Sequence, residues 1–86
     1  MATTTLRIIC DSGHAWLEVT AAELAAAGFE PSRYSYYSPG MVYLEEDCDL
    51  PGYLAAAGID ASAVTWRETY IDGSCWVRDL DRFPRS

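Results

Sequence analysis

The stretch Gly13-His14-Ala15-Trp16-Leu17 sets a pattern in which a glycine is followed, three residues later, by an aromatic and then an aliphatic residue. The pattern returns twice, as Gly40-Met41-Val42-Tyr43-Leu44 and as Gly73-Ser74-Cys75-Trp76-Val77. Each copy follows an apolar or tyrosine-rich run and a turn, which is typical of the turn and second strand of a β-hairpin. Asp72-Gly73 is the strongest of these signals, since a type I′ turn needs positive φ at both central positions. The chain is therefore predicted to contain three hairpins.

Two short helical segments separate the predicted hairpins and nearly copy each other. Residues 24–32 read LAAAGFEPS and residues 54–62 read LAAAGIDAS. Together with the three hairpins, they give the order ββα-ββα-ββ. An internal duplication explains this order better than a chance match in an alanine-rich chain does.

Capping residues mark both helices. Thr20 and Glu23 are spaced as a capping box, in which each side chain accepts a hydrogen bond from the backbone of the other. Asp49 is the expected cap of the second helix, and Pro51 lies in its first turn, where the missing N–H costs nothing. Gly28 and Gly58 end the helices, because glycine adopts positive φ cheaply.

These elements predict an α+β fold in a single domain that spans residues 1–86. The sheet is expected to be antiparallel with about six strands, and both short helices are expected on one face. Such helices are not stable alone and need packing. The predicted strands are residues 6–10, 15–19, 34–37, 41–45, 64–71 and 75–80.

Strand alternation divides the repeated pattern between the two faces of the sheet. Its aliphatic members are predicted to face the helices in a core made of Leu6, Ile8, Leu17, Val42, Leu44 and Val77 against Leu24, Leu50 and Leu54. Its aromatic members, Trp16, Tyr43 and Trp76, would point the other way. A two-layer fold leaves that face uncovered, and a large exposed aromatic patch usually marks a binding surface. The alternative is a second small core, in which the aromatic residues lie under loops or the C-terminal tail.

The charge balance favours a basic partner. Thirteen Asp and Glu stand against six arginines and no lysine, which gives a net charge of −7. Nucleic acids and membrane surfaces are anionic and would repel such a chain. The candidate partner-binding residues are Trp16, Glu18, Tyr43, Glu45, Glu46, Asp47, Asp49 and Trp76.

The acidic run Glu45-Glu46-Asp47-Cys48-Asp49 leaves three interpretations open. It could pair with an arginine- or lysine-rich partner. It could bind a divalent cation through its oxygens, although it lacks the spacing and the turn glycine of an EF-hand loop. It could also be a solvated loop that favours the start of the second helix.

Catalytic and metal-binding signals are weak, so we predict a protein that is not an enzyme and has no cofactor or metal. Asp11, Ser12 and His14 are neighbours in a turn, and a triad depends on geometry rather than proximity in sequence. Three cysteines, at positions 10, 48 and 75, are odd in number and widely spaced, which argues against a disulfide framework. A zinc site formed by these cysteines and His14 is the alternative to small buried thiols.

Location is predicted from what the sequence lacks. No apolar run approaches the roughly 20 residues of a membrane helix, and the first residues do not have the basic start and apolar stretch of a signal peptide. A cytoplasmic protein is therefore expected.

Three segments carry a resemblance to known proteins: DSGHAWLEV (residues 11–19), YLEEDCD (residues 43–49) and RDLDRFP (residues 78–84). They resemble a group of small proteins from bacterial mobile elements, phages and plasmids, that have no assigned activity. In size and charge the chain is also similar to anti-CRISPR and other anti-defence inhibitors, which typically occupy the basic nucleic-acid groove of a defence complex. The resemblance implies an acidic protein-binding inhibitor. The alternative is a small-molecule-binding or homo-oligomerising domain, such as a homodimer, that uses the aromatic face.

Overall fold

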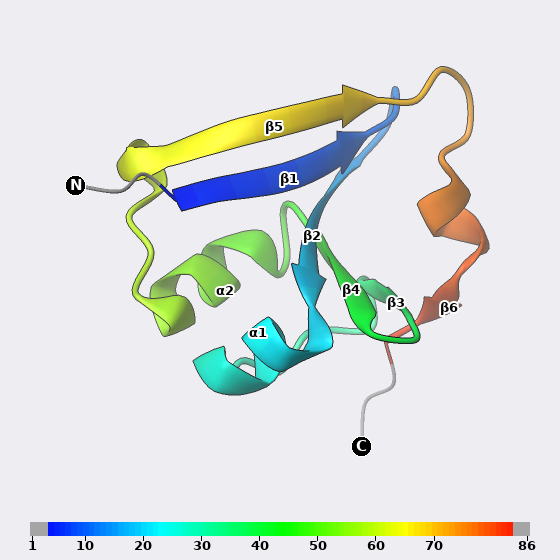
Figure 1. Ribbon diagram of the computed structural model, residues 1–86. Helices are drawn as coiled ribbons and strands as arrows, with labels where there is room; N and C mark the ends of the chain where they lie inside the picture. Colours follow the sequence, from blue (N-terminus) through cyan, green and yellow to red (C-terminus); the bar gives the residue numbers. More distant parts are fainter. Residues whose placement is uncertain (1–3, 84–86) are drawn as a thin grey trace.

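The computed structural model describes residues 4–83 and confirms an α+β fold with a six-stranded sheet and two α-helices (Figure 1). The elements in chain order are β1 (Thr4–Cys10), β2 (Ala15–Thr20), α1 (Ala21–Ala27), β3 (Tyr36–Ser38), β4 (Met41–Glu45), α2 (Leu50–Ala57), the 3₁₀ helix η1 (Ala61–Ala63), β5 (Val64–Tyr70), the 3₁₀ helix η2 (Trp76–Asp79) and β6 (Asp81–Arg82).

The sheet is mixed rather than wholly antiparallel. Its strand order is β5-β1-β2-β4-β3-β6, and β1 and β5 pair in parallel over their whole length, from Thr4 opposite Val64 to Cys10 opposite Tyr70. The other pairs are antiparallel. The prediction of an antiparallel sheet is therefore wrong at this edge. The reason is that α2 forms a crossover connection, which brings the chain back to the sheet in the direction of β4 and not as a hairpin.

Two of the three predicted hairpins form. β1 pairs with β2, with Ile8 opposite Leu17, and β3 pairs with β4, with Tyr37 opposite Val42. The third does not form, since β5 pairs only with β1 among the described residues. No residue other than glycine has positive φ in residues 4–83, so the Asp72-Gly73 turn is not type I′. The segment predicted as its second strand is mainly the helix η2. The internal duplication stays a prediction.

Both helices begin and end at the predicted residues, but only α1 has the predicted side-chain cap. The Thr20 side chain accepts from the Glu23 N–H at 3.0 Å and the Glu23 carboxylate accepts from the Thr20 N–H at 2.9 Å, which confirms the capping box of α1. Gly28 and Gly58 close α1 and α2 with φ of 68° and 69°. Asp49 occupies the cap position of α2, but its side chain makes no capping hydrogen bond.

Both α-helices pack on one face of the sheet, where the main core lies. The predicted aliphatic residues are there, with two exceptions. Ile8 is only partly buried and is not part of this core, and Val77 lies in a different cluster. Leu50 is partly buried and packs against the core. The buried members of this core are Leu6, Leu17, Val19, Leu24, Val42, Leu44, Tyr53 and Leu54.

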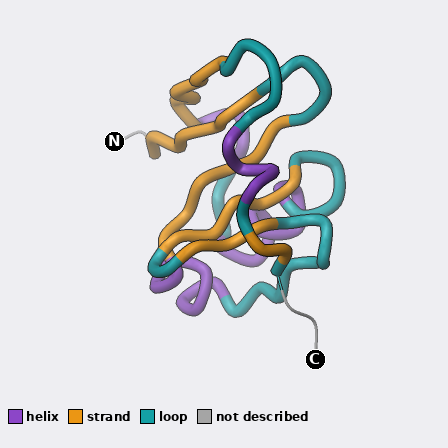
Figure 2. The backbone as a smooth tube through the Cα atoms, turned by 90° about the vertical axis from the view of Figure 1, so that its right-hand side faces the viewer, coloured by secondary structure: helices purple, strands orange, loops and turns teal. Residues whose placement is uncertain are grey.

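A second core occupies the opposite face, which the C-terminal segment covers. In Figure 2 the chain of η2 passes in front of the strands. Trp16 and Tyr43 are only 1% and 5% exposed, so the prediction of an open aromatic face is wrong for both, and the alternative of a second core is confirmed. Trp76 remains 41% exposed and meets the Tyr43 ring edge-on at 5.1 Å. The buried members of the second core are Ile9, Trp16, Tyr36, Tyr43, Cys75 and Val77.

Candidate functional site

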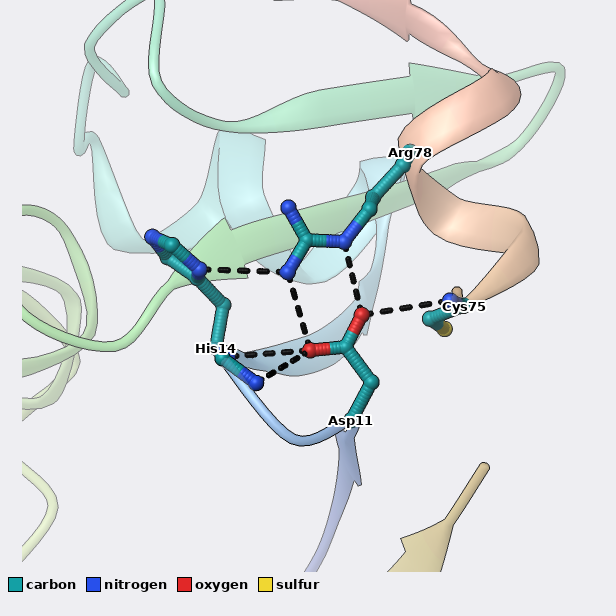
Figure 3. A network of polar contacts seen from close by, with 5 residues as sticks. Asp11, His14, Cys75 and Arg78 are labelled. Atoms are coloured by element: carbon teal, nitrogen blue, oxygen red, sulfur yellow. Dashed lines mark hydrogen bonds and ion pairs between the residues drawn. The ribbon is translucent and has the colours of Figure 1, made fainter. Parts of the chain in front are cut away.

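A buried carboxylate fixes the C-terminal segment to the sheet. Asp11, directly after β1, accepts hydrogen bonds from the backbone N–H groups of Gly13 and His14, both at 2.9 Å, and of Cys75 at 3.1 Å (Figure 3). It also binds the Arg78 guanidinium through Nε at 2.7 Å and Nη2 at 2.9 Å. The hydrogen bonds from Arg78 hold the pKa of Asp11 well below its usual range, and the backbone N–H donors act in the same direction. The carboxylate is therefore ionised whenever the protein is folded near neutral pH.

The same guanidinium organises the aromatic side chains beside it. Arg78 lies over the Trp16 ring at 5.2 Å, and the His14 ring stacks on Trp16 at 6.0 Å. Arg78 Nη2 lies 3.2 Å from His14 Nδ1 (Figure 3). Because a guanidinium can only donate, Nδ1 is the acceptor in this contact.

A polar hollow of about 370 Å³ opens next to this assembly. Its aromatic walls come from β2, β3 and the turn that precedes β3. Guanidinium, imidazole, carboxylate and thiol groups complete the lining. The indole Nε1 of Trp16 is buried and has no hydrogen-bond partner within the described part of the chain. The hollow itself is the best candidate for a small-ligand site, because aromatic rings and several charged or polar groups converge on it. The lining residues are His14, Trp16, Tyr34, Tyr36, Glu45, Asp47, Cys48, Arg78 and Arg82.

The acidic run after β4 divides into buried and exposed members. Asp49 is buried and accepts from the Ser32 N–H at 3.0 Å, the Ser32 hydroxyl at 2.8 Å and the Ser35 hydroxyl. Glu45 is also buried, and its Oε2 accepts from the N–H groups of Asp47 and Cys48 at 3.0 and 2.8 Å. These two carboxylates hold loops in place and are not available to a partner, which corrects the prediction that they bind one.

The remaining predicted site residues are exposed or form an ion pair within the chain. Glu46, Asp47 and Trp76 are exposed. Glu18 is half-buried and pairs with Arg7 at 3.2 Å. The structure therefore does not bring the eight predicted residues together on one surface. It brings only three of them, Trp16, Glu45 and Asp47, to the polar hollow.

The thiols and the acidic groups give little support to catalysis or metal binding. A hydrogen bond with Glu45 raises the pKa of the Cys48 thiol, and burial raises that of Cys10, so both thiols stay protonated and are weak nucleophiles. Between residues 4 and 83, no three His, Cys, Asp or Glu side chains gather in a way that could hold a metal ion. The described residues therefore give no support to the zinc and divalent-cation alternatives.

Several residues of the hollow were not predicted as site residues. Arg78 binds Asp11 across 67 positions of sequence, and no local pattern marks such a pair. Arg82 lies over the Tyr36 ring at 5.5 Å because β6 pairs with β3, which hairpin signals do not indicate. The Asp11-Ser12-Gly13 turn was visible in the sequence, but it indicates only the two local hydrogen bonds of Asp11.

No protein-family model, curated protein or solved structure matches this chain. In the described range, no helix has the length and apolar character needed to cross a membrane.

Proposed function

We propose that this protein is an acidic protein-binding inhibitor of the anti-defence type, which occupies a basic surface where its target normally holds nucleic acid. The single observation that supports the proposal is the distribution of charge in the folded chain. Two arginines form ion pairs with carboxylates of the same chain, whereas most of the other carboxylates face solvent.

The two ion pairs are Arg7 with Glu18 and Arg78 with Asp11, at 3.2 and 2.7 Å. Each pair neutralises one arginine and one carboxylate, so the other charged groups carry the net charge of −7. Most of the remaining acidic side chains are exposed. They are Glu23, Glu30, Glu46, Asp47, Asp60, Glu68, Asp72, Asp79 and Asp81.

A surface of this kind attracts a basic partner over long range and repels polyanions. Lysine and arginine clusters that bind nucleic-acid phosphates supply the matching charge. Folding thus leaves an acidic exterior, and this exterior does not depend on the aromatic residues that are buried in the second core.

The proposal is tested in two steps. Purified protein should bind poly-L-lysine at about 50 mM NaCl and lose most of that binding at about 500 mM NaCl, where exposed charges are screened. Co-expression with bacterial defence systems during phage challenge should then restore phage growth against at least one system. The variant Glu46→Lys/Asp47→Lys should weaken both effects, because it reverses two exposed charges. Binding that does not change with salt, or no binding, contradicts the proposal.

The polar hollow favours a second candidate function, the binding of a small polar ligand with a hydrogen-bond acceptor. The observation behind it is the lining of the hollow, in which the Arg78 and Arg82 guanidinium groups lie over the Trp16 and Tyr36 rings. Arg82→Gln removes one of these cations and keeps a long polar side chain. In a thermal-shift screen of small polar aromatic compounds, a ligand of the hollow should stabilise the wild type and not the Gln variant. A screen without such a compound, or a compound that stabilises both proteins equally, counts against this function.

A further inference from the structure

The strand β5 leaves one edge of the sheet open. It pairs only with β1, and no described residue pairs with its outer side. Figure 1 shows β5 as the outermost strand, on the far side of β1 from the rest of the sheet. An open edge presents a row of backbone N–H and C=O groups that can accept another strand.

Both faces of this strand are also poorly covered. Thr65, Trp66, Arg67 and Glu68 are all exposed, whereas the neighbouring β1 buries residues on both faces. The strand contains no proline, and its seven residues pair with β1 without a bulge, so two of the usual protections of an edge strand are missing.

A groove of about 320 Å³ lies beside this edge, on the face that carries the helices. Ile8, Leu50 and the 39%-exposed ring of Trp66 give it apolar walls, and Glu46 and Glu68 add two exposed carboxylates. No basic residue lines it. This combination suits an arginine or lysine side chain, whose stem packs on apolar surface while its cation meets carboxylates and an aromatic ring.

We propose that the open edge of β5 binds an extended basic segment of a partner protein, which adds to the sheet as a further strand and places an arginine or lysine side chain in this groove. The inference rests on the proposed function and names the surface that carries it. Backbone hydrogen bonds along the strand supply affinity, and the groove supplies selectivity for a basic residue.

Charge distinguishes this partner from a second copy of the chain. In a symmetric antiparallel pair of β5 strands, full overlap places Arg67 opposite Arg67. If the two-fold axis moves by one residue toward the C-terminal end of β5, Glu68 lies opposite Glu68. Like charges directly opposite each other are destabilising, whereas a basic strand meets Glu68 favourably. A shift in the opposite direction gives the same overlap and places Trp66 opposite Trp66, with no like-charge pair across the strands. Charges on the strand therefore disfavour self-pairing in two of these three registers, and the net charge of −7 on each copy opposes the third.

The test uses a fluorescein-labelled heptapeptide of alternating valine and arginine, with blocked ends, and the whole protein. Fluorescence anisotropy should show binding, and amide hydrogen exchange should slow at residues 64–70. Glu46→Lys and Glu68→Lys should each weaken peptide binding about tenfold, since each replaces an attraction by a repulsion. The matched control Glu30→Lys reverses an exposed charge outside the groove and should change the affinity less than about twofold.

The outcomes separate this site from the general function. If poly-L-lysine binds but the peptide does not, or if Glu68→Lys and Glu30→Lys weaken the peptide equally, the β5 site is wrong and the acidic-inhibitor proposal stands. Equal binding of a peptide methylated at every backbone nitrogen also overturns strand addition. If neither poly-L-lysine nor the peptide binds, both proposals are wrong. Urea unfolding of each variant confirms that a loss of binding is not a loss of folding.

Discussion

Away from the edge strand β5, the two faces of the sheet are both closed, but by different means. On one face, the short helices α1 and α2 cover an aliphatic core. On the other, the segment around η2 covers an aromatic core. Both helices end at a glycine, and α1 begins at a capping box, so these signals lie within a few residues of each helix end. The C-terminal segment instead depends on contacts between Asp11 and a guanidinium 67 residues later. The difference teaches that a face without predicted helices is not necessarily an open face.

The largest expected effect tests whether the second core is as important as the first. Trp16→Ala should lower the free energy of unfolding by about 3–5 kcal/mol, because it empties a large buried site. Leu17→Ala, on the neighbouring residue that faces the helices, should cost about 2–5 kcal/mol. Urea unfolding measures both.

The exposed Trp76 is the control for this pair, and truncation to alanine there should cost much less than at Trp16. If Trp16→Ala costs no more than Trp76→Ala, the aromatic face is not a core in solution. The C-terminal segment would then be only loosely attached, and the comparison of two equal faces would fail.

A smaller effect separates the buried carboxylates from the exposed ones. Asp49→Ala should cost about 2–3 kcal/mol, because it leaves the Ser32 N–H and the Ser32 and Ser35 hydroxyls without their acceptor. Asp47→Ala, two residues earlier and exposed, should stay within about 0.5 kcal/mol of the wild type. Equal costs in urea unfolding would mean that the acidic run acts as one solvated loop.

Sequence reasoning succeeded where the signal was local. The capping box at Thr20, the glycine stops at positions 28 and 58, and the first two hairpins all depend on residues within a few positions of one another. Period-2 alternation also placed Leu17 and Trp16 on opposite faces. What it could not decide was whether solvent or protein lies against the second face.

The remaining features depend on partners that are distant in sequence. β5 has the composition of any hairpin strand, and only the crossover through α2 makes it parallel to β1. Asp49 is a good cap by residue type, but Ser32 and Ser35 compete for its oxygens across 17 and 14 positions. The candidate hollow was missed for the same reason, since its arginines come from a segment that was predicted to be a strand and a tail.

The effect of pH tests how the C-terminal segment is attached. The pKa of Asp11 is lowered in the folded protein, so its contribution to stability is full above the unfolded value, near 3.9, and is lost as the pH falls toward the folded pKa. Asp11→Asn lacks this contribution. The gap in stability between wild type and Asp11→Asn should therefore be largest near neutral pH and shrink below about pH 4.

Urea unfolding across this pH range measures the gap, and amide exchange at residues 75–80 should be about tenfold faster in the variant near neutral pH, since the segment opens more often. Glu18→Gln, which removes the carboxylate charge from an exposed ion pair, is the control and should leave this exchange unchanged. A gap that stays constant with pH would mean that η2 is held by packing of Val77 and Cys75 alone.

The smallest effect concerns the start of α1. Thr20→Ala removes the acceptor for the Glu23 N–H and should cost about 1 kcal/mol, while Thr20→Ser keeps the acceptor and should cost less. Urea unfolding measures both variants. The expected cost is below that of Leu17→Ala, because helices this short are held mainly by their packing on the sheet. If Thr20→Ala proves as costly as Leu17→Ala, the cap controls the helix face. The two faces would then differ in what stabilises them as well as in what covers them.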